Sequence, residues 1–333
     1  MIYLPTTKAK VLRILEKNRG QSISGSKLAK TLNISRAAIW KIIEELRNEG
    51  FEINAMTNKG YCLAESSDIL SVEGILLHSQ NPQIKREQIH VYKTLESTNQ
   101  LAKKMAVAGG SHGTVILAEE QTQGRGRLGR SFFSPKGTGL YMSIILRPEG
   151  TADQAVLTTT AASVAVCRAL STTLGIEAQI KWVNDIFVNN RKVSGILTEA
   201  ISNFETGSIE SLILGIGINV STEKYNFPEE LQGIAGSLLK KNSSNTISRN
   251  QLAASIIHEI FTVYETINSG DFIPEYKSRC FVLGKEVRVH RGIEEYNAKA
   301  IDIDSQGALI IERQDGSKET LNSGEISIRT KTD

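Results

Sequence analysis

The sequence has few cysteines and no long hydrophobic run. Its three cysteines, Cys62, Cys167 and Cys280, lie far apart and form no C-x-x-C motif. This spacing argues against a disulfide framework and a cysteine zinc site, and it fits a reducing cytoplasm. No run of 18 apolar residues is present, so we expect no membrane-spanning segment. The N-terminus, MIYLPTTKAK, lacks the apolar core of a signal peptide. We therefore expect a cytoplasmic protein with no membrane partner.

Familiar nucleotide-binding and hydrolase motifs are also missing. The stretch Gly124–Gly129 matches G-x-G-x-x-G, but a dinucleotide site needs a helix directly after the motif. The segment that follows, SFFSPKGTG, contains a proline and two glycines and is unsuited to a helix. No G-x-x-x-x-G-K-[ST] motif occurs, and nothing resembles a Ser-His-Asp triad. These absences exclude a Rossmann site, a P-loop and a serine hydrolase.

The composition is that of a soluble protein with two or three domains. The chain has 333 residues, of which 40% are hydrophobic and 23% charged. The net charge of +3 is unevenly distributed. Residues 1–65 carry 11 Lys and Arg against 6 Asp and Glu, whereas the rest carries 28 against 30. A small basic module therefore precedes a slightly acidic body, which suggests a nucleic-acid partner for the first part.

The first 65 residues have the pattern of a winged helix-turn-helix. Helices are predicted over Lys8–Asn18, after Ser24, and after the turn Asn33–Ser35, where Ser35 can cap the third helix. In that helix Ile39, Ile42, Ile43 and Leu46 follow helical spacing and should face the core. Short strands at Phe51–Ile53 and Tyr61–Leu63 would form the wing.

The third helix has the position of a recognition helix in the major groove of DNA. Its candidate DNA-binding residues lie at its start and on the face opposite the core: Ser35, Arg36, Ala37, Trp40 and Lys41. Arginine and lysine there can reach base edges or phosphates. A protein-docking module with a charged face is the alternative, and an exposed tryptophan would also suit that.

The rest of the chain divides into a linker and two further domains. We place a polar linker with a short helix at residues 66–80, a central domain at 81–270 and a C-terminal module at 271–333. Strands in hairpins alternate with helices in the central domain, which predicts a mixed-sheet α+β fold rather than a doubly wound one.

A loop in the central domain combines glycine with arginine. Arg125, Arg127 and Arg130 alternate with Gly124, Gly126 and Gly129. Glycine lets the backbone approach an anion, and guanidinium groups offer paired donors to phosphate or carboxylate. The loop therefore suggests a small anionic ligand. A solvated basic loop or a DNA contact remains possible on spacing alone.

Three ordered segments resemble the biotin–protein ligase family. They are QTQGRGRLGRSFFSPKGTGLYMS, KWVNDIFVNNRKVSGILTE and LGIGINV, which begin at Gln121, Lys181 and Leu214. With the helix-turn-helix in front and a C-terminal GALII…GEISIR stretch, nearly the whole chain is similar to the bifunctional bacterial members. This resemblance implies a ligase that is also a repressor of the biotin operon.

The resemblance also implies the reaction and its partners. Biotin's carboxylate attacks the α-phosphate of ATP with Mg²⁺, giving biotinyl-5′-AMP and pyrophosphate. A lysine of biotin carboxyl carrier protein, in acetyl-CoA carboxylase and other biotin-dependent carboxylases, then takes the biotin and releases AMP. Biotinyl-5′-AMP would also act as corepressor by promoting a homodimer on operator DNA.

The resemblance assigns site residues one by one. Biotin would contact Ser97, Thr98, Asn99, Gln121, Arg125, Gly126, Arg127 and Lys192. The catalytic and adenylate residues would be Lys181, Asn184, Asp185, Arg130 and Arg329. Asp185 would hold Mg²⁺ or orient the incoming lysine, so no metal ligand is certain.

Simpler interpretations of the same residues exist. Ser97 could be a helix N-cap, Lys181 and Asp185 an ion pair, and Gly215 and Gly217 a means of close strand packing. Two positions depart from the family pattern: Val183 stands where proline is common, and Phe132 stands near a common tryptophan. Neither change removes a chemical group.

Residues 271–333 alternate apolar and polar positions. The alternation predicts strands at Lys285–His290, Glu295–Ile303, Ala308–Glu312 and Lys318–Leu321. Five or so short strands suggest an SH3-like barrel, which the family has. The resemblance places Arg329 near the nucleotide; a cap that only adds stability is the alternative.

Two other functions remain open. The central domain could sense biotin or biotinyl-5′-AMP for a transcription regulator without turnover. A lipoate-type ligase, which also adenylates a carboxylate, is the third option. The arginine–glycine loop, Lys181 and Lys192 favour turnover, and Gln121 with GRGRLGR favours biotin.

Overall fold

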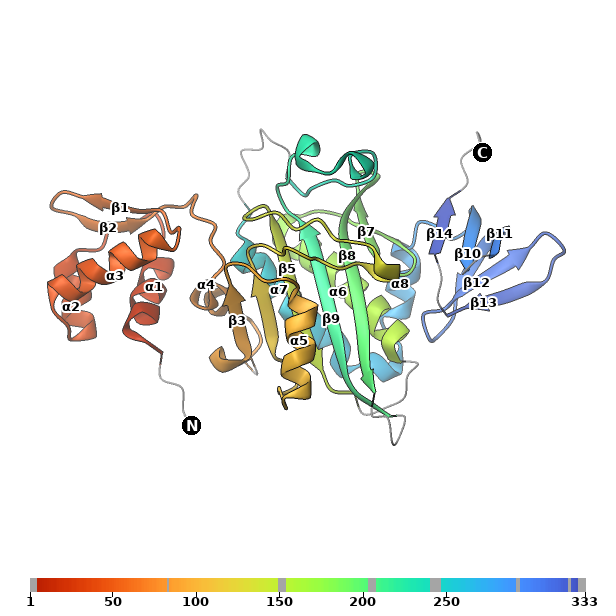
Figure 1. Ribbon diagram of the computed structural model, residues 1–333, viewed down its shortest axis with the longest axis horizontal. Helices are drawn as coiled ribbons and strands as arrows, with labels where there is room; N and C mark the ends of the chain where they lie inside the picture. Colours follow the sequence, from red (N-terminus) through yellow and green to blue (C-terminus); the bar gives the residue numbers. More distant parts are fainter. Residues whose placement is uncertain are drawn as a thin grey trace.

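The computed structural model describes residues 5–82, 84–148, 154–202, 208–239, 247–291, 294–322 and 325–328. Three parts follow one another along the chain and across the molecule, with the helix-turn-helix at one end, a large sheet in the middle and a small sheet at the other end (Figure 1). The predicted α+β class is therefore confirmed.

The N-terminal part has the predicted helix-turn-helix and wing. Its elements are α1 Thr7–Lys17, α2 Gly25–Leu32, α3 Arg36–Asn48, β1 Ile53–Met56 and β2 Gly60–Leu63. Ser24 and Ser35 cap α2 and α3 by accepting hydrogen bonds from backbone N–H groups three residues on. Ile39, Ile43 and Leu46 are fully buried in a core cluster made only of residues from this part. Its separate core makes the module a folding unit of its own.

The first wing strand begins two residues later than predicted. The backbone N–H of Phe51 donates to Leu46 O at 3.1 Å, and that of Gly50 donates to Arg47 O at 2.9 Å. Because these two N–H groups close the end of α3, Phe51 belongs to the helix terminus and pairing with β2 starts at Ile53.

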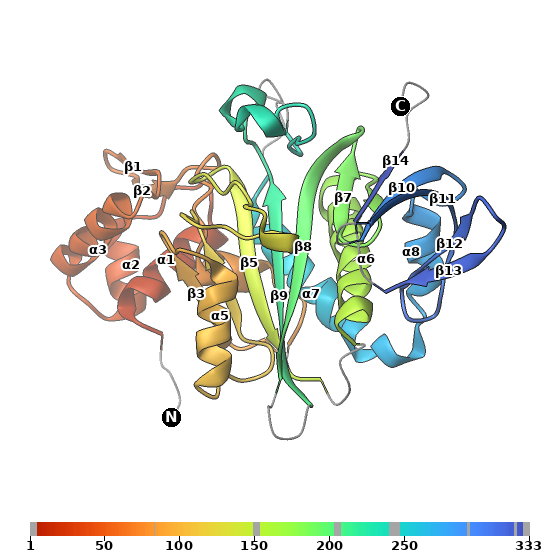
Figure 2. The same cartoon turned by 45° about the vertical axis from the view of Figure 1, so that its right-hand side comes forward.

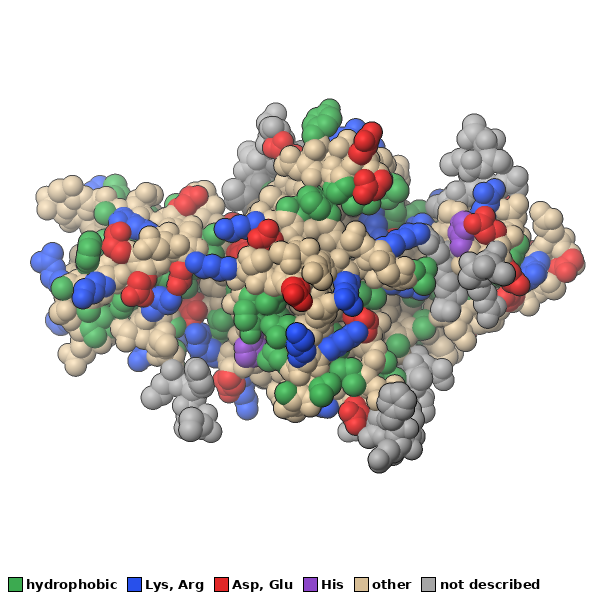
Figure 3. All heavy atoms as spheres, in the orientation of Figure 1, with side chains coloured by type: hydrophobic (Ala, Val, Ile, Leu, Met, Phe, Trp, Pro, Cys, Tyr) green, Lys and Arg blue, Asp and Glu red, His purple; other side chains and the backbone are tan. Residues whose placement is uncertain are grey.

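The predicted recognition face of α3 is open to solvent. Arg36, Ala37 and Lys41 are exposed, as is Ser35 at the cap. Trp40 leaves 55% of its surface uncovered. In Figure 3, Lys and Arg side chains are spread over the outer side of this module.

A seven-stranded mixed sheet forms the centre of the molecule. Its strand order is β3-β4-β5-β9-β8-β7-β6, with β3 and β4 parallel and all other neighbours antiparallel. The strands are β3 Ile89–Tyr92, β4 Val115–Ala118, β5 Gly139–Leu146, β6 Gln179–Lys181, β7 Asp185–Val188, β8 Arg191–Ser202 and β9 Ile209–Asn219.

Helices cover both faces of this sheet unequally (Figure 2). One face carries α5 (Thr98–Val107), whose Ala102 and Ala106 pack on Ile116, Ile145 and Ile213. The other face carries α6 (Gln154–Leu174) and α7 (Arg249–Glu265), with α4 (Val72–His78) against α7. Because α5 is short, the rest of its face stays free for loops.

Helix α6 is apolar and long enough to span a membrane by composition alone. The window Ala155–Leu174 has a mean hydropathy of 1.3, yet 72% of it is buried within the protein. It packs on α7 and β8, so its apolar character is explained by its position in the core.

The C-terminal part is a five-stranded antiparallel sheet. Its order is β13-β12-β11-β10-β14, from β10 Glu286–Arg291, β11 Glu294–Ile303, β12 Leu309–Arg313, β13 Lys318–Leu321 and β14 Glu325–Ile328. Among the described residues β13 and β14 do not pair, so the sheet is not closed into a barrel. A helix not predicted from the sequence, α8 (Ile273–Arg279), precedes the sheet.

The small sheet shares its core with the central domain. Val287, Val289 and Ala300 belong to the same buried cluster as the residues beneath the large sheet. The indole N–H of Trp182 donates to Gly307 O at 3.0 Å. These contacts fix the C-terminal part beside the end of β6.

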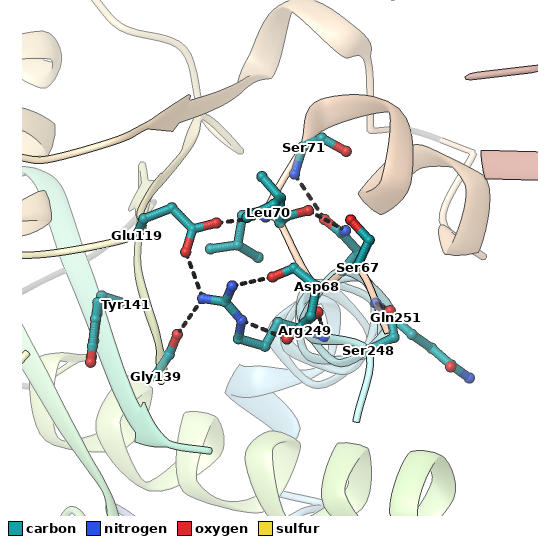
Figure 4. Close-up of polar contacts among 12 residues, drawn as sticks. Ser67, Asp68, Leu70, Ser71, Glu119, Gly139, Tyr141, Ser248, Arg249 and Gln251 are labelled. Carbon is teal, nitrogen blue, oxygen red and sulfur yellow. Dashed lines mark hydrogen bonds and ion pairs between the residues drawn. The ribbon is translucent and has the colours of Figure 1, made fainter. Parts of the chain in front are cut away.

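The segment after the wing is held firmly by the start of α7 (Figure 4). Arg249, whose side chain is 1% exposed, pairs with Asp68 at 2.7 Å and with Glu119 at 2.8 Å. Burial alone would lower the pKa of Arg249, but the two carboxylates outweigh it and raise this pKa above its ordinary value. Arg249 therefore remains charged in the interior.

The separate N-terminal core allows a stability test. Ile43→Ala should destabilise the module by about 2–5 kcal/mol, because it leaves a cavity among buried side chains. Trp40→Ala, one turn away on the exposed face, should change stability by less than about 1 kcal/mol. Urea unfolding followed by far-UV circular dichroism measures both. Equal effects would contradict the burial assigned to α3.

Candidate active site

One cavity lies beside α5, on the face of the large sheet that this helix covers only in part. It encloses about 260 Å³. Its walls come from the start of α5, the loop 120–138 between β4 and β5, strands β6 to β9, the segment 221–239 and β14. Figures 1 and 2 show loop 120–138 crossing this face of the sheet, with segment 221–239 standing above it. The cavity is thus formed by segments distant in sequence.

Uncharged polar groups occupy one end of the cavity. Gln121 Oε1 accepts hydrogen bonds from the backbone N–H and the hydroxyl of Thr98, at 2.8 and 3.1 Å. Gln121 Nε2 donates to Ser134 Oγ at 2.9 Å. An amide carries two N–H donors, and within the described chain Nε2 has this one acceptor. Gln121 therefore has a second donor available to a ligand.

Asn99 differs from Gln121 because its neighbours leave it an unused acceptor rather than an unused donor. Its Nδ2 donates to Glu199 Oε2 at 2.8 Å and to Leu197 O at 3.4 Å. Its Oδ1 accepts from Ser143 Oγ at 2.6 Å. Both N–H groups are used and one lone pair of Oδ1 is left, so Asn99 can accept a hydrogen bond from a ligand. This end of the cavity offers a donor and an acceptor side by side.

A glycine makes room for Asn99. A Cβ atom at Gly215 of β9 would lie 2.2 Å from Asn99 Oδ1, far inside contact distance. At Gly217, two residues on, a Cβ would lie 2.5 Å from the ring of Phe132. Both glycines therefore give space to side chains that line the cavity, in addition to any role in strand packing.

The other end of the cavity is strongly cationic. Five cations line it: Arg125, Arg127, Arg130, Lys181 and Lys192. Asp185 is the one carboxylate among the described lining residues. Lys192 Nζ lies 2.7 Å from Asp185 Oδ1, and Arg127 Nη1 donates to Asn184 Oδ1 at 3.1 Å. This excess of positive charge suits a ligand with several negative charges.

Loop 120–138 is shaped by its glycines and by one strained residue. A Cβ at Gly124 would lie 2.3 Å from Phe132 O, so only glycine fits where the loop folds back on itself. Leu128 has φ 54° and ψ 37°, within the short 3₁₀ turn Arg127–Gly129. The turn places Arg127 and Arg130 on either side of the exposed Leu128.

Segment 221–239 makes two main-chain hydrogen bonds with Lys192. The N–H of Lys192 donates to Ile234 O, and the N–H of Gly236 donates to Lys192 O, both at 2.9 Å. Leu231 and Ile234 line the cavity from this side. Figure 3 shows hydrophobic side chains along the lower side of the upper segment, toward the crossing loop.

Titratable groups behind the cavity are locked in their neutral forms. Tyr276 is fully buried and donates to Val183 O at 3.1 Å, and burial raises its pKa well above the ordinary value. Burial likewise raises the pKa of Cys280 to about 11.

The described residues contain no group of three or more His, Cys, Asp or Glu suited to a metal ion.

The cavity brings together twelve of the thirteen residues that the resemblance assigned to biotin and adenylate. Arg329 lies outside the described residues. Ser97 occupies the N-cap position of α5, but its hydroxyl makes no capping hydrogen bond. The Trp182–Val183 peptide bond, at the departure from the family pattern, is cis.

Several neighbours of the site were missed from the sequence. They are Ser134, Ser143 and Glu199. All three lie within the segments that resemble the family, and Ser143 is also the one serine inside an apolar strand. Their roles could not be assigned until the fold placed them next to Gln121 and Asn99.

Three family models match the chain. They are the biotin/lipoate A/B protein ligase family over residues 91–219, an HTH domain over 7–62 and the biotin protein ligase C-terminal domain over 282–329. The chain is 34% identical over 321 residues to the bifunctional ligase/repressor BirA of Bacillus spizizenii, covering 96% of this chain and 98% of that protein. It is 32% identical to the BirA of Escherichia coli over 98% of both chains.

Solved structures agree with these sequence relatives. The biotin protein ligase of Aquifex aeolicus in complex with biotin and ATP superposes with a TM-score of 0.61 at 28% identity. The match covers 72% of this chain and 98% of that one.

The cationic end of the cavity can be tested with a simple anion. Inorganic pyrophosphate should raise the unfolding temperature, since a ligand at 100 times its Kd stabilises the folded state by about 2.7 kcal/mol. Lys192→Met should reduce this shift, and Lys41→Met, on the recognition helix, should not. Differential scanning fluorimetry measures the shift. Identical shifts in both variants would show that the anion binds elsewhere.

Proposed function

Since the chain belongs to the biotin/lipoate A/B protein ligase family, we propose that it adenylates biotin and transfers it to a lysine of biotin carboxyl carrier protein. We propose further that it represses the biotin operon with biotinyl-5′-AMP as corepressor. One observation carries the enzymatic part. A single cavity joins an uncharged hydrogen-bonding end to five cations, which matches a ligand with a urea at one end and an acyl-phosphate at the other.

Biotin's urea matches the uncharged end. A urea carbonyl accepts a hydrogen bond and its N–H groups donate, so Gln121 would bind the carbonyl and Asn99 an N–H. Ser97 and Thr98 complete this end. Both amides are held in one orientation by neighbours, so little side-chain entropy is lost on binding. Phe132 and Ile216, which also line the cavity, would cover the thiophane ring.

The first reaction step brings two anions together. A carboxylate oxygen of biotin attacks the α-phosphorus of ATP, the bond to the β-phosphate oxygen breaks, and pyrophosphate leaves. Arg125, Arg127 and Lys192 would neutralise the carboxylate and the α-phosphate, Gly126 would let the backbone approach them, and Lys181 and Arg130 would contact the polyphosphate. Preplaced cations lower the barrier because they need no reorganisation as the charge develops.

Magnesium fits this site in a limited way. Mg²⁺ commonly uses one or two protein carboxylates and takes its remaining ligands from phosphate and water, and Asp185 is the one described carboxylate in the lining. Bound with ATP, the ion would neutralise phosphate charge. Asp185 is paired with Lys192, so it can also steady that lysine or accept a hydrogen bond from the incoming amine. Asn184 holds Arg127 in place.

In the second step the acceptor amine attacks the acyl carbon of biotinyl-5′-AMP. The bond from that carbon to the phosphate oxygen breaks, AMP leaves, and the amine gives up a proton. The cationic lining stabilises AMP as the leaving group. A regulator that senses biotin alone would not need five cations. A regulator that senses biotinyl-5′-AMP would need them, so turnover must be measured to separate it from the ligase.

One assay distinguishes the three functions that the sequence left open. Purified protein is incubated with Mg²⁺-ATP, labelled biotin or labelled lipoate, and a carboxylase acceptor domain. The ligase transfers biotin and releases AMP and pyrophosphate. Biotin binding without AMP formation would indicate a sensor, and transfer of lipoate alone would indicate a lipoate ligase.

Two glycines provide a variant and its control. Gly215→Ala should weaken biotin binding by at least tenfold, because its Cβ would displace Asn99. Gly233→Ala, outside the cavity lining, should have little effect, since its Cβ would meet nothing within 4 Å. Isothermal titration calorimetry with biotin compares them. Equal affinities would remove Asn99 from the binding site.

The further parts of the proposal concern architecture and location. We assign residues 1–65 to DNA binding, 66–80 to a linker, 81–270 to catalysis and 271–333 to a C-terminal domain. In the C-terminal domain, β10 to β13 form a four-strand meander and β14 pairs with β10. This arrangement supports an SH3-like module. Cys62, Cys167 and Cys280 are free thiols, which supports a cytoplasmic location.

Operator binding would need two copies of the chain. One helix-turn-helix reads only a few base pairs, and two-fold dimers gain specificity on half-sites spaced to match. We propose that biotinyl-5′-AMP promotes this dimer by ordering the cavity loops. To make a state populated at 1% dominant, a ligand must favour it by roughly 10⁴-fold, or about 5.5 kcal/mol.

Sedimentation velocity tests the dimer. The dimer fraction should rise when biotin and Mg²⁺-ATP are present together, and operator affinity should rise with it. Arg36→Ala should reduce operator affinity while leaving dimerisation and biotin transfer unchanged. Equal dimer fractions with and without ligand would leave a ligase whose DNA-binding domain is uncoupled from its active site.

A further inference from the structure

Arg249 is a buried charge that the proposed reaction does not use. It is the first residue of α7 and lies outside the cavity lining. Its guanidinium donates to Asp68 Oδ2 at 2.7 Å, Glu119 Oε2 at 2.8 Å, Gly139 O at 3.0 Å and, through Nη2, to Asp68 O. Three segments of the chain thus meet at one side chain (Figure 4).

Two of these partners are the ends of the loop that lines the cavity. Glu119 directly follows β4 and stands two residues before Gln121, and Gly139 is the first residue of β5. A single nitrogen, Nη1 of Arg249, contacts both. The two ends are also joined by the main chain, through the β4–β5 pair Ala118 and Tyr141 and the bond from Gly137 N–H to Glu119 O at 3.2 Å. Arg249 adds a charged side-chain contact to both ends.

The third partner is the segment that leaves the helix-turn-helix. Asp68 accepts from both the backbone N–H and the Nε of Arg249. The second oxygen of Glu119 accepts from the backbone N–H of Leu70 at 2.7 Å. Asn250, next to Arg249, binds Ser71 N–H and Ile69 O at 2.9 and 2.8 Å. Each residue from 68 to 71 is thus bonded to this cluster.

The N-terminal domain holds the residues just before these. Nη1 of Arg19, at the end of α1, donates to Ala64 O at 3.2 Å and also bonds Ser67 O. Ser67 Oγ accepts from the N–H of Glu52 at 3.1 Å. A continuous set of hydrogen bonds therefore runs from the helix-turn-helix through residues 64–71 to the ends of loop 120–138.

Stability accounts for the number of these partners but not for where they lie. A buried guanidinium needs acceptors for its five N–H groups, and any part of the fold could supply them. Arg249 has two carboxylates and two backbone carbonyls as acceptors, and every one of them lies at an end of loop 120–138 or in the segment after the wing.

We propose that Arg249 is a positioning residue for ligand binding: it braces the two ends of loop 120–138, and its ion pair with Asp68 links this brace to the segment after the wing. The proposal rests on the proposed function, since it is biotin affinity that the loop position controls. Loop 120–138 carries Gln121, which faces the urea, and Arg127, which faces the acyl-phosphate. Loss of the Arg249 contact would loosen the loop at Glu119, two residues before Gln121.

Asp68→Asn in the full-length protein is the informative variant. It removes the charge and one of the two oxygen acceptors, because an amide group has a single oxygen. The side chain of Asp68 is 33% exposed, so folding should survive. A charged hydrogen bond exceeds a neutral one by about 1 kcal/mol, so the KM for biotin should rise about fivefold. The kcat at saturating biotin should stay within about twofold, because no reacting group is altered. Glu119→Gln should act in the same direction.

Glu275→Gln is the matched control. Glu275 also accepts from two arginines, Arg168 and Arg279, at 2.8 and 2.9 Å, but it joins α8 to α6 rather than to the loop. This variant should lower the unfolding temperature as much as Asp68→Asn and leave the KM for biotin unchanged. A lower unfolding temperature with an unchanged KM in Asp68→Asn would overturn the proposal.

Hydrogen exchange gives a readout that a structural ion pair would not alter. Coupling is reciprocal, so biotin bound to the wild-type chain should slow amide exchange in residues 64–71, and Glu119→Gln should remove this protection. Unchanged exchange in those residues on biotin binding would also overturn the proposal. Failure of the wild-type chain to bind biotin would instead contradict the proposed function.

Discussion

The repulsion among five cations in one cavity is the constraint around which the site is organised. Two unit charges 4 Å apart at a protein surface interact by about 4 kcal/mol, and the described lining offers one carboxylate, Asp185, against Arg125, Arg127, Arg130, Lys181 and Lys192. The protein meets this cost by pairing Asp185 with Lys192 and by placing the three arginines on a glycine-rich loop. In the proposed function, the phosphate groups of the ligand would add negative charge at this end of the cavity.

The shape of the cavity depends on two glycines as much as on the side chains that line it. Gly215 and Gly217 remove two Cβ atoms from one side of β9, and Asn99 and Phe132 occupy the space. Asn99 at the polar end and the ring of Phe132 therefore pack directly against the backbone of β9. Glu199 and Ser143 fix the amide of Asn99, while Thr98 and Ser134 fix that of Gln121. In the proposed function, these fixed orientations would provide the selectivity for a urea.

The sequence predicted local structure well wherever one residue type determined it. Ser24 and Ser35 marked two helix starts, and the alternation at Lys318–Leu321 gave β13 its observed bounds. It did not predict α8, whose start is marked only by Pro274. Glu199 and Arg249 could not be found either, because their importance comes from contacts that span 100 and 130 residues. Spacing along the chain carries no information about partners that only the sheet brings together.

Lys192 has its side chain in the cavity and its main chain bonded to segment 221–239. Any displacement of that segment must therefore carry the backbone of this lysine with it. The wall of the cavity on this side and the position of one of its cations are therefore coupled through two hydrogen bonds. A substitution in the segment that never touches a ligand can still alter the charge that a ligand meets.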